Sequence, residues 1–165
     1  MTIDTLKRVG IFLLFCIAQA LVLNRIQLFG FATPLLYVYF VLMFPRNYSK
    51  WALLLWSFSL GLVIDMFTNT PGVASASLTL IGAIQPYLLE LFIPRDADEN
   101  MQVSALNLGW GKFATYTTLA VTLFCLAFFS FEAFNLFNWL YWLQCVIGSS
   151  LLTILLILTL ESVRK

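Results

Sequence analysis

The sequence predicts an all-α membrane protein, and three observations lead to that class. Of the 165 residues, 61% are hydrophobic and 10% are charged, whereas a soluble domain has about 45–50% apolar and about 25% charged residues. The mean hydropathy is +0.92. The apolar runs are long and lack the alternation of a membrane β-strand, and helices satisfy their own backbone groups in lipid. The chain length predicts one transmembrane domain over residues 1–165.

Six segments are candidates for transmembrane helices, because a bilayer core of about 30 Å needs about 20 helical residues. The second segment, at about 31–44, is short and lies between Gly30 and Pro45. We expect Pro34 in its opening turn, where a missing N–H is harmless. Such a short helix must be buried among its neighbours, thin the bilayer locally or begin earlier. The six expected spans cover about 9–29, 31–44, 51–67, 73–93, 113–131 and 136–160.

Lys and Arg are distributed unevenly over the loops between these spans. If the N-terminus is cytoplasmic, eight of the nine basic residues fall on the cytoplasmic side and only Arg25 falls outside. Cytoplasmic loops carry an excess of Lys and Arg, so we expect both termini to be cytoplasmic. The first apolar run lacks a clean signal-peptide cleavage site and is expected to be a retained span. The cytoplasmic basic residues are Lys7, Arg8, Arg46, Lys50, Arg95, Lys112, Arg164 and Lys165.

The sequence offers no pattern for catalysis or for a cofactor. It has no histidine, the commonest general base and metal ligand. Cys16, Cys125 and Cys145 lie inside apolar runs, where they are expected to be buried thiols. The sequence shows no nucleophile–base pair, phosphate-binding loop or metal motif, and no basic stripe for nucleic acid. We therefore expect a protein without enzymatic activity, cofactor or metal.

Asp65 is the polar group that most needs an explanation, because a charge at the bilayer centre costs roughly 2.5–3.5 kcal/mol. Arg25 is expected at a comparable depth and would form an ion pair with it in one arrangement. In a second arrangement Asp65 accepts main-chain N–H groups from the 68–72 turn or from the next helix, whose N-terminus favours negative charge. Both arrangements make Asp65 a structural clamp, and the remaining alternative is direct contact with a partner or ligand.

Two prolines mark special positions near this residue and beyond it. Pro71 followed by Gly72 predicts a tight turn, because Pro fixes φ and Gly permits positive φ. Pro86 lies inside the expected span 73–93, where it is expected to kink the helix. Glu90 follows near the cytoplasmic interface, where Arg95 or Lys112 would neutralise it.

Small residues recur at helical spacing on several spans, which permits close helix approach. We expect these faces to pack inside the bundle, and the alternative is an exposed seam between two copies of the chain. The loop at about 94–112 is expected to be a solvated connector or, alternatively, a docking surface for a cytoplasmic partner. The small-residue faces are Ser57 with Gly61, Thr118 with Thr122, and Gly148 with Ser149 and Thr153.

Residues 61–88 resemble the rod shape-determining protein family MreD. That family is recognised by a helix that ends in G-x-x-x-D, a short turn that reaches a glycine, and a following helix rich in small residues. Gly61, Asp65, Pro71 and Gly72 occupy the matching positions. The chain is also similar to the family in size, in its six expected spans and in its short loops.

The resemblance implies a non-enzymatic subunit of the machinery for lateral cell-wall growth in the bacterial cytoplasmic (inner) membrane. It implies association with MreC, which has one span and a periplasmic domain. The actin-like MreB and the peptidoglycan synthases, a glycosyltransferase–transpeptidase pair, would act alongside. The family also looks like the S-components of energy-coupling-factor vitamin transporters, which implies a six-helix bundle with an outward cavity.

The alternative function is that of such an S-component, which binds a vitamin. S-components resemble one another in an Ala-xxx-Ala face on the first helix. Here Ala18 and Ala20 are spaced by two residues and do not form that face.

Overall fold

The computed structural model describes residues 2–27, 29–134 and 136–164, and every regular element in these ranges is helical. This confirms the all-α class. Two short 3-10 turns, η1 (Leu23–Arg25) and η2 (Leu136–Asn138), accompany the α-helices. The α-helices are α1 (Ile3–Leu21), α2 (Val38–Leu42), α3 (Lys50–Thr68), α4 (Val73–Glu90), α5 (Ala105–Leu108), α6 (Trp110–Glu132) and α7 (Trp139–Val163).

Within the described ranges, four helical segments are long and apolar enough to cross a bilayer: Ile3–Arg25, Lys50–Thr68, Trp110–Glu132 and Trp139–Val163. The expected spans at 51–67, 113–131 and 136–160 correspond to α3, α6 and α7. The first helix begins at Ile3 rather than near residue 9, and its α-helical part ends at Leu21. Its first turns therefore carry the polar residues that were expected to precede it.

Helix α4 matches the expected span at 73–93 but is not one of these four segments. Its 18 residues correspond to a length of about 27 Å at 1.5 Å per residue. It packs against α3 and α6, so much of its polar small-residue surface is covered by protein. The helix continues from Pro86 to Glu90, so Pro86 does not end it.

The expected helix at 31–44 is wrong over half of its length. The chain from residue 31 to residue 37 is irregular, and only the five residues of α2 are α-helical. Thr33 precedes Pro34, and a residue in that position is biased toward extended backbone. Irregular backbone is tolerated at membrane depth when it is buried in protein. Of the three expected consequences of a short span, burial among the neighbouring helices is confirmed.

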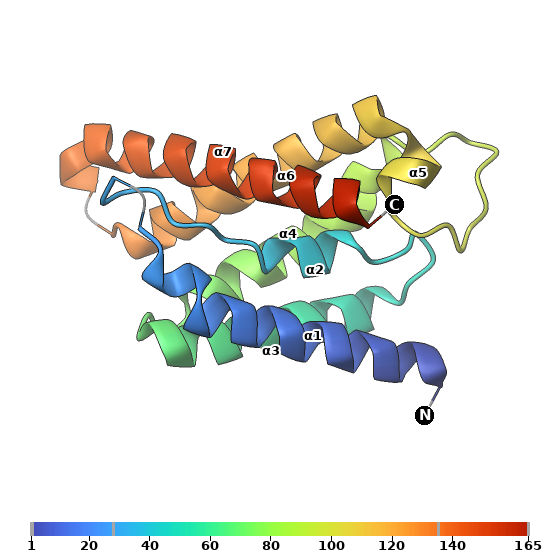
Figure 1. The fold of residues 1–165 in the computed structure, drawn as a ribbon, viewed down its shortest axis with the longest axis horizontal. Helices are drawn as coiled ribbons and strands as arrows, with labels where there is room; N and C mark the ends of the chain where they lie inside the picture. Colours follow the sequence, from blue (N-terminus) through green and yellow to red (C-terminus); the bar gives the residue numbers. More distant parts are fainter. Residues whose placement is uncertain (1, 28, 135, 165) are drawn as a thin grey trace.

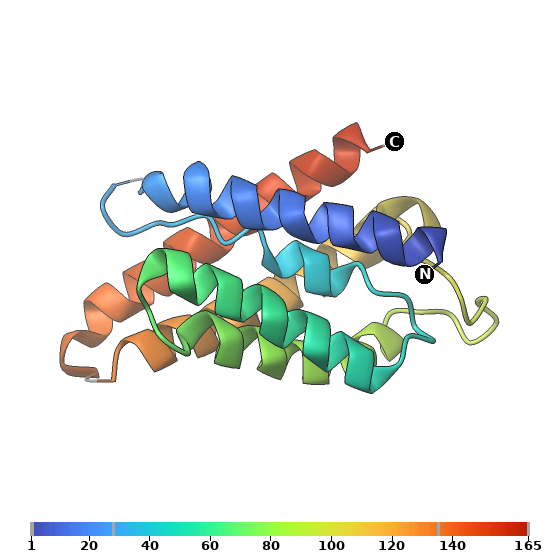
Figure 2. The same cartoon turned by 90° about the horizontal axis from the view of Figure 1, so that it is seen from below.

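Figure 1 shows the 31–44 segment running between α1 and α7, with α2 near the middle of the molecule. Figure 2 shows α3 and α4 side by side and α1 running alongside α3. Both chain ends lie at the same end of the bundle in the two views. We call this the proximal end, and the opposite end, which holds the 68–72 turn, the distal end.

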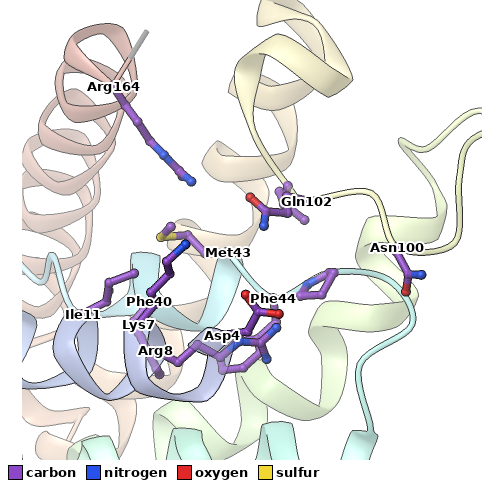
Figure 3. A pocket seen from close by; sticks show the side chains of 12 residues that line it. Asp4, Lys7, Arg8, Ile11, Phe40, Met43, Phe44, Asn100, Gln102 and Arg164 are labelled. Atoms are coloured by element: carbon purple, nitrogen blue, oxygen red, sulfur yellow. The ribbon is translucent and has the colours of Figure 1, made fainter. Parts of the chain in front are cut away.

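Each end of the bundle contains a pocket. The proximal pocket has a volume of ≈ 700 Å³ and is lined by residues from α1, from α2 and the 43–45 segment after it, and from the 100–103 loop, together with Arg164 directly after α7 (Figure 3). The distal pocket has a volume of ≈ 550 Å³ and is lined by the distal parts of α1, α3, α6, α7 and the 30–37 segment. The family resemblance implies a cavity that opens to the outer side, which would be the distal side with both termini in the cytoplasm.

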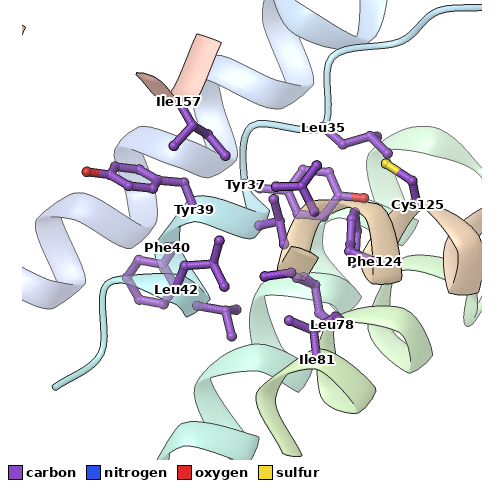
Figure 4. Close-up of a cluster of buried hydrophobic side chains, with 14 of the residues drawn as sticks. Leu35, Tyr37, Tyr39, Phe40, Leu42, Leu78, Ile81, Phe124, Cys125 and Ile157 are labelled. Carbon is purple, nitrogen blue, oxygen red and sulfur yellow. The ribbon is translucent and has the colours of Figure 1, made fainter. Parts of the chain in front are cut away.

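The hydrophobic core is built around the 35–44 segment (Figure 4). Val38 and Val41 are completely buried, and Tyr37 packs edge-on against Phe124 of α6 with ring centroids 5.6 Å apart. Phe40 makes a similar contact with Phe44 at 5.3 Å. The α2 helix in this segment contacts α1 and α3 as well as α4 and α6. Its apolar side chains therefore join these four helices.

Candidate functional site

Asp65 lies at the distal end of α3, where it ties the end of α3 to the start of α4. Its side chain is 5% exposed, and both carboxylate oxygens accept hydrogen bonds from the following turn and helix. This is the second of the two expected arrangements. The donors are the main-chain N–H groups of Gly72 (3.1 Å), Ala74 (2.8 Å) and Ser75 (3.0 Å), together with the hydroxyl of Thr70 (3.3 Å).

The local sequence explains why the chain turns back at this point. Asn69 takes the left-handed conformation and ends α3, and Gly72 has φ +86° immediately before α4. The expected turn with positive φ at Gly72 is confirmed. Gly72 has no side chain to cap α4, so the first N–H groups of that helix need an acceptor from elsewhere. Asp65 supplies it, and its negative charge also suits the helix N-terminus.

Gly61 allows α3 and α4 to come into backbone contact one turn before Asp65. A Cβ atom added at Gly61 would lie 2.3 Å from Ser75 Cα and 2.9 Å from the carbonyl carbon of Ala74. Backbone atoms cannot move away as a flexible side chain can. The glycine is therefore needed for Asp65 to reach the N–H groups of α4, which gives the G-x-x-x-D spacing a physical reason.

A second close contact joins the same two helices further toward the proximal end. A Cβ at Gly82 of α4 would lie 2.6 Å from the hydroxyl oxygen of Ser57 on α3. The Ser57 hydroxyl donates to the carbonyl of Leu53 in its own helix at 2.8 Å. The expected internal packing of the Ser57–Gly61 face is thus confirmed.

The other small-residue faces differ from one another. Ser149 and Thr153 are fully buried against the 31–37 segment, so internal packing is confirmed there. Thr118 is exposed, and its hydroxyl and that of Thr122 bond within their own helix. The prediction of internal packing is therefore wrong for the Thr118–Thr122 face, because the opposite side of α6 packs against α4 and α7.

The remaining residues singled out from the sequence do not gather at Asp65. Arg25 lies in η1 at the distal end, and within the described ranges Arg25 and Asp65 form no ion pair, since the only recorded ion pair joins Arg164 and Glu161. Pro71 is exposed in the turn. Glu90 is exposed at the other end of α4, and no ion pair with Arg95 or Lys112 is recorded among the described side chains.

The irregular 31–37 segment is held by side chains from distant helices. Gln19 of α1 donates to the carbonyl of Pro34 at 3.0 Å. Ser149 and Thr153, one turn apart on α7, accept the main-chain N–H groups of Thr33 and Leu35, each at 3.1 Å. The backbone groups that a helix would have paired are thereby satisfied inside the bundle.

The distal pocket contains buried polar atoms without a partner. Gln19 Oε1, Tyr37 Oη and Trp142 Nε1 make no hydrogen bond within the described structure, and all three residues line this pocket. Gln19 and Tyr37 are each 1% exposed. Buried polar groups are normally paired, so this wall offers one acceptor, one donor and one hydroxyl to an occupant.

The Asp65 corner and the distal pocket share a wall. Thr68 and Thr70 line the pocket, their hydroxyls lie 2.6 Å apart, and Thr70 also donates to Asp65. Asp65 itself is not part of the lining. Its role is therefore to fix the turn whose hydroxyls face the pocket.

Sequence reasoning missed Glu161, a buried carboxylate near the end of α7. It is 4% exposed, accepts the main-chain N–H of Ala105 at 2.8 Å, and accepts a hydrogen bond from the hydroxyl of Tyr39. Arg164 lies 3.9 Å away. Glu161 comes at the end of the apolar run of the last span, as Asp65 does in the third span. This position in the sequence could have marked Glu161 as a candidate for a buried carboxylate.

At both buried carboxylates, Asp65 and Glu161, hydrogen bonds from main-chain N–H groups hold neighbouring segments of the chain in place. In the described part of the chain no group of three or more His, Cys, Asp or Glu side chains could hold a metal ion. Cys16, Cys125 and Cys145 are buried free thiols.

Comparison of the chain with protein-family models, with curated proteins and with solved structures finds no match.

Proposed function

We propose that this chain is a non-enzymatic integral membrane subunit of the bacterial rod, or elongation, complex. In this role it binds an MreC-like single-span partner and helps to position cell-wall synthesis, which maintains cell shape. The observation that supports the proposal most is the corner built by Gly61, Asp65 and Gly72. These are residues on which the resemblance to the MreD family rests, and they act as one structural unit.

The proposed topology has six crossings in the cytoplasmic (inner) membrane and both termini in the cytoplasm. Beside the four long apolar helices, α4 and the 31–44 segment supply the other two crossings. Both run between the two ends of the bundle (Figure 1). Lys and Arg favour this orientation, because Arg25 is the only one at the distal end among the described residues, and Lys165 lies outside the described residues.

The proposed contact with the partner is the exposed apolar surface of the distal corner. Met66 is 82% exposed and Phe67 63% exposed, and Pro71 lies exposed in the adjacent turn. Asp65 is buried and its oxygens are occupied, so it shapes this surface and does not touch the partner. Helix association in lipid relies on close packing, which a rigid corner favours.

The test is site-specific photo-crosslinking of the tagged chain in growing bacteria. A crosslinking residue in place of Phe67 should capture a single-span protein with a periplasmic domain, whereas one in place of Leu155, exposed on α7, should not. Depletion of the chain should make rod-shaped cells round. Unchanged cell shape after depletion, together with no single-span adduct at Phe67, would refute the proposal.

The distal pocket favours a second candidate, an S-component that binds a vitamin. Its unpartnered groups at Gln19, Tyr37 and Trp142 are the convergent polar atoms that a ligand site requires. A chain with this function would co-purify with ATPase subunits and carry a small molecule detectable by mass spectrometry. The Tyr37→Phe variant would then lose that molecule, and cells without the chain would require the vitamin.

A further inference from the structure

The proximal pocket has a charge and a shape that the proposed function does not use. Lys7, Arg8 and Arg164 line it, and Asp4 is the only acidic side chain among the described lining residues. The lining carries three positive charges and one negative charge, and with Glu161, which lies 3.9 Å from Arg164, the site keeps an excess of one positive charge. A pocket with this excess is suited to an anion.

The basic side chains reach this pocket from different elements. Figure 3 shows Lys7 of α1 and Arg164, directly after α7, directed toward the same opening, with the amide of Gln102 approaching from the loop. Lys7 makes no hydrogen bond or ion pair with another described residue. Arg164 has only the 3.9 Å contact with Glu161, a carboxylate that already accepts from Tyr39 and Ala105.

Arg8 is held in the wall of the pocket by aromatic rings. Its guanidinium carbon lies 4.2 Å from the ring centroid of Tyr48 and 5.3 Å from that of Phe44. Its Nη1 atom is buried and has no hydrogen-bond partner within the described structure. A buried, unpaired guanidinium N–H is unfavourable, and a nearby anion would offset its charge.

The surroundings indicate that the anion belongs to a lipid. The apolar side chains of Ile11, Phe40 and Met43 also line the pocket. The α1 helix, which forms one wall, carries exposed Leu14 one turn after the pocket-lining Ile11, and an acyl chain can lie along it. Basic pockets between membrane helices on the cytoplasmic side bind anionic headgroups in this way, and the proximal end is the cytoplasmic side in the topology proposed above.

We propose that the proximal pocket binds the phosphate group of an anionic phospholipid, with Lys7 and Arg164 contacting the phosphate and Arg8 contributing charge from the wall. The chemistry that is recognised is a phosphate whose negative charge is not cancelled by a quaternary ammonium group, as it is in phosphatidylcholine. Phosphatidylglycerol and free inorganic phosphate both carry such a phosphate, and the test distinguishes them.

The test uses the purified full-length chain in mild detergent, with phosphatidylglycerol, phosphatidylcholine and inorganic phosphate added in separate titrations. Native mass spectrometry measures bound lipid, and thermal unfolding measures stabilisation. We expect phosphatidylglycerol to bind and stabilise, and phosphatidylcholine to do so much less. The Lys7→Gln/Arg164→Gln variant should bind phosphatidylglycerol about tenfold more weakly or worse.

The matched control is Arg95→Gln/Lys112→Gln, which removes two positive charges at the same end but outside the pocket. It should retain the affinity of the original chain. Equal binding of the two lipids, or an equal loss in both double variants, would overturn the proposal. Inorganic phosphate that stabilises as well as phosphatidylglycerol and displaces it would overturn the assignment to a lipid.

A single variant keeps the test decisive if the double variant does not fold. The Lys7 side chain is exposed, so Lys7→Gln should leave folding intact. It should weaken phosphatidylglycerol binding several-fold, and Lys7→Arg should restore it. An unchanged affinity in Lys7→Gln would count against the pocket.

Discussion

Thr153 on α7 accepts the main-chain N–H of Leu35 at 3.1 Å, although 118 positions separate the two residues in the chain. One turn earlier on the same helix, Ser149 does the same for Thr33. Two hydroxyls at helical spacing therefore replace hydrogen bonds that residues 31–37 would have made within a helix. This relationship explains how an irregular segment can lie in the centre of an apolar bundle.

Removing the Thr153 hydroxyl should test this role directly. Thr153→Val keeps the volume of the side chain but leaves the Leu35 N–H buried without an acceptor, which costs about 1–3 kcal/mol. Thermal unfolding in detergent should show a clear loss of stability. Thr159→Val is the control, because the Thr159 hydroxyl is exposed and bonds only within α7; an equal effect in both variants would contradict the assignment.

The Asp65 clamp should be sensitive to loss of its charge and of one acceptor. Asp65→Asn turns an NH₂ group toward main-chain donors that now have a carboxylate, so we expect a loss of about 1–3 kcal/mol of stability and reduced levels in the membrane. Glu90→Gln, at an exposed position at the other end of α4, should have little effect. If the Asp65→Asn variant unfolded at the same temperature as the original chain, the four hydrogen bonds would contribute little to stability.

Gly61→Ala should be strongly destabilising because its new methyl group meets backbone atoms of Ser75 and Ala74. Overpacking of this kind costs about 1–3 kcal/mol. Gly111→Ala in α6 is the control, because a Cβ there has no neighbour within 4 Å. Unfolding followed by tryptophan fluorescence should separate the two variants, and similar midpoints would argue against close backbone contact at Gly61.

The Gly82 contact should differ from the Gly61 contact because its neighbour is a side chain. Gly82→Ala meets the Ser57 hydroxyl, so the double variant with Ser57→Ala should recover part of the lost stability. A double-mutant cycle should give a coupling energy on the order of 0.5–3 kcal/mol. Ser57→Ala should not rescue Gly61→Ala, and a rescue there would mean that the two contacts are not separate.

Glu161→Gln should loosen the proximal loop that precedes α5. The amide offers a single acceptor in place of two, so the Ala105 N–H or the Tyr39 hydroxyl loses its partner. We expect trypsin to cleave after Arg95 several-fold faster than in the original chain. The exposed Glu99 provides the control variant Glu99→Gln, and equal cleavage rates in the two variants would contradict the prediction.

Several parts of the fold could be read from local sequence. The α3, α6 and α7 helices follow from long apolar runs, because a run of that length has no other stable form in lipid. The turn before α4 follows from Pro71 and Gly72, since positive φ at Gly72 needs no knowledge of distant residues. Asp65 could be singled out because a carboxylate in such a run needs compensation.

Other parts depend on which helices become neighbours. The sequence placed Arg25 and Asp65 at a comparable depth in the membrane, which suggested an ion pair. In the structure the main-chain N–H groups at the start of α4, which are closer to Asp65 in the chain, occupy its carboxylate oxygens instead. Thr118 and Thr122 have the same spacing as Ser149 and Thr153, yet Thr118 is exposed and Thr122 is only half-buried. Spacing shows that two side chains share a helix face but not which face the neighbouring helices cover.

By itself, the sequence determined that this protein is helical, that α3, α6 and α7 are long apolar helices, and where α3 turns into α4; it predicted six spans, and the structure describes four helices long and apolar enough to cross a membrane. The tertiary structure decided the irregular path of residues 31–37, the burial of Glu161 and the two pockets. The physical reason is the range of the interactions. Helix formation and turn geometry depend on neighbouring residues, whereas the partners of a buried polar group come from whichever helices pack beside it.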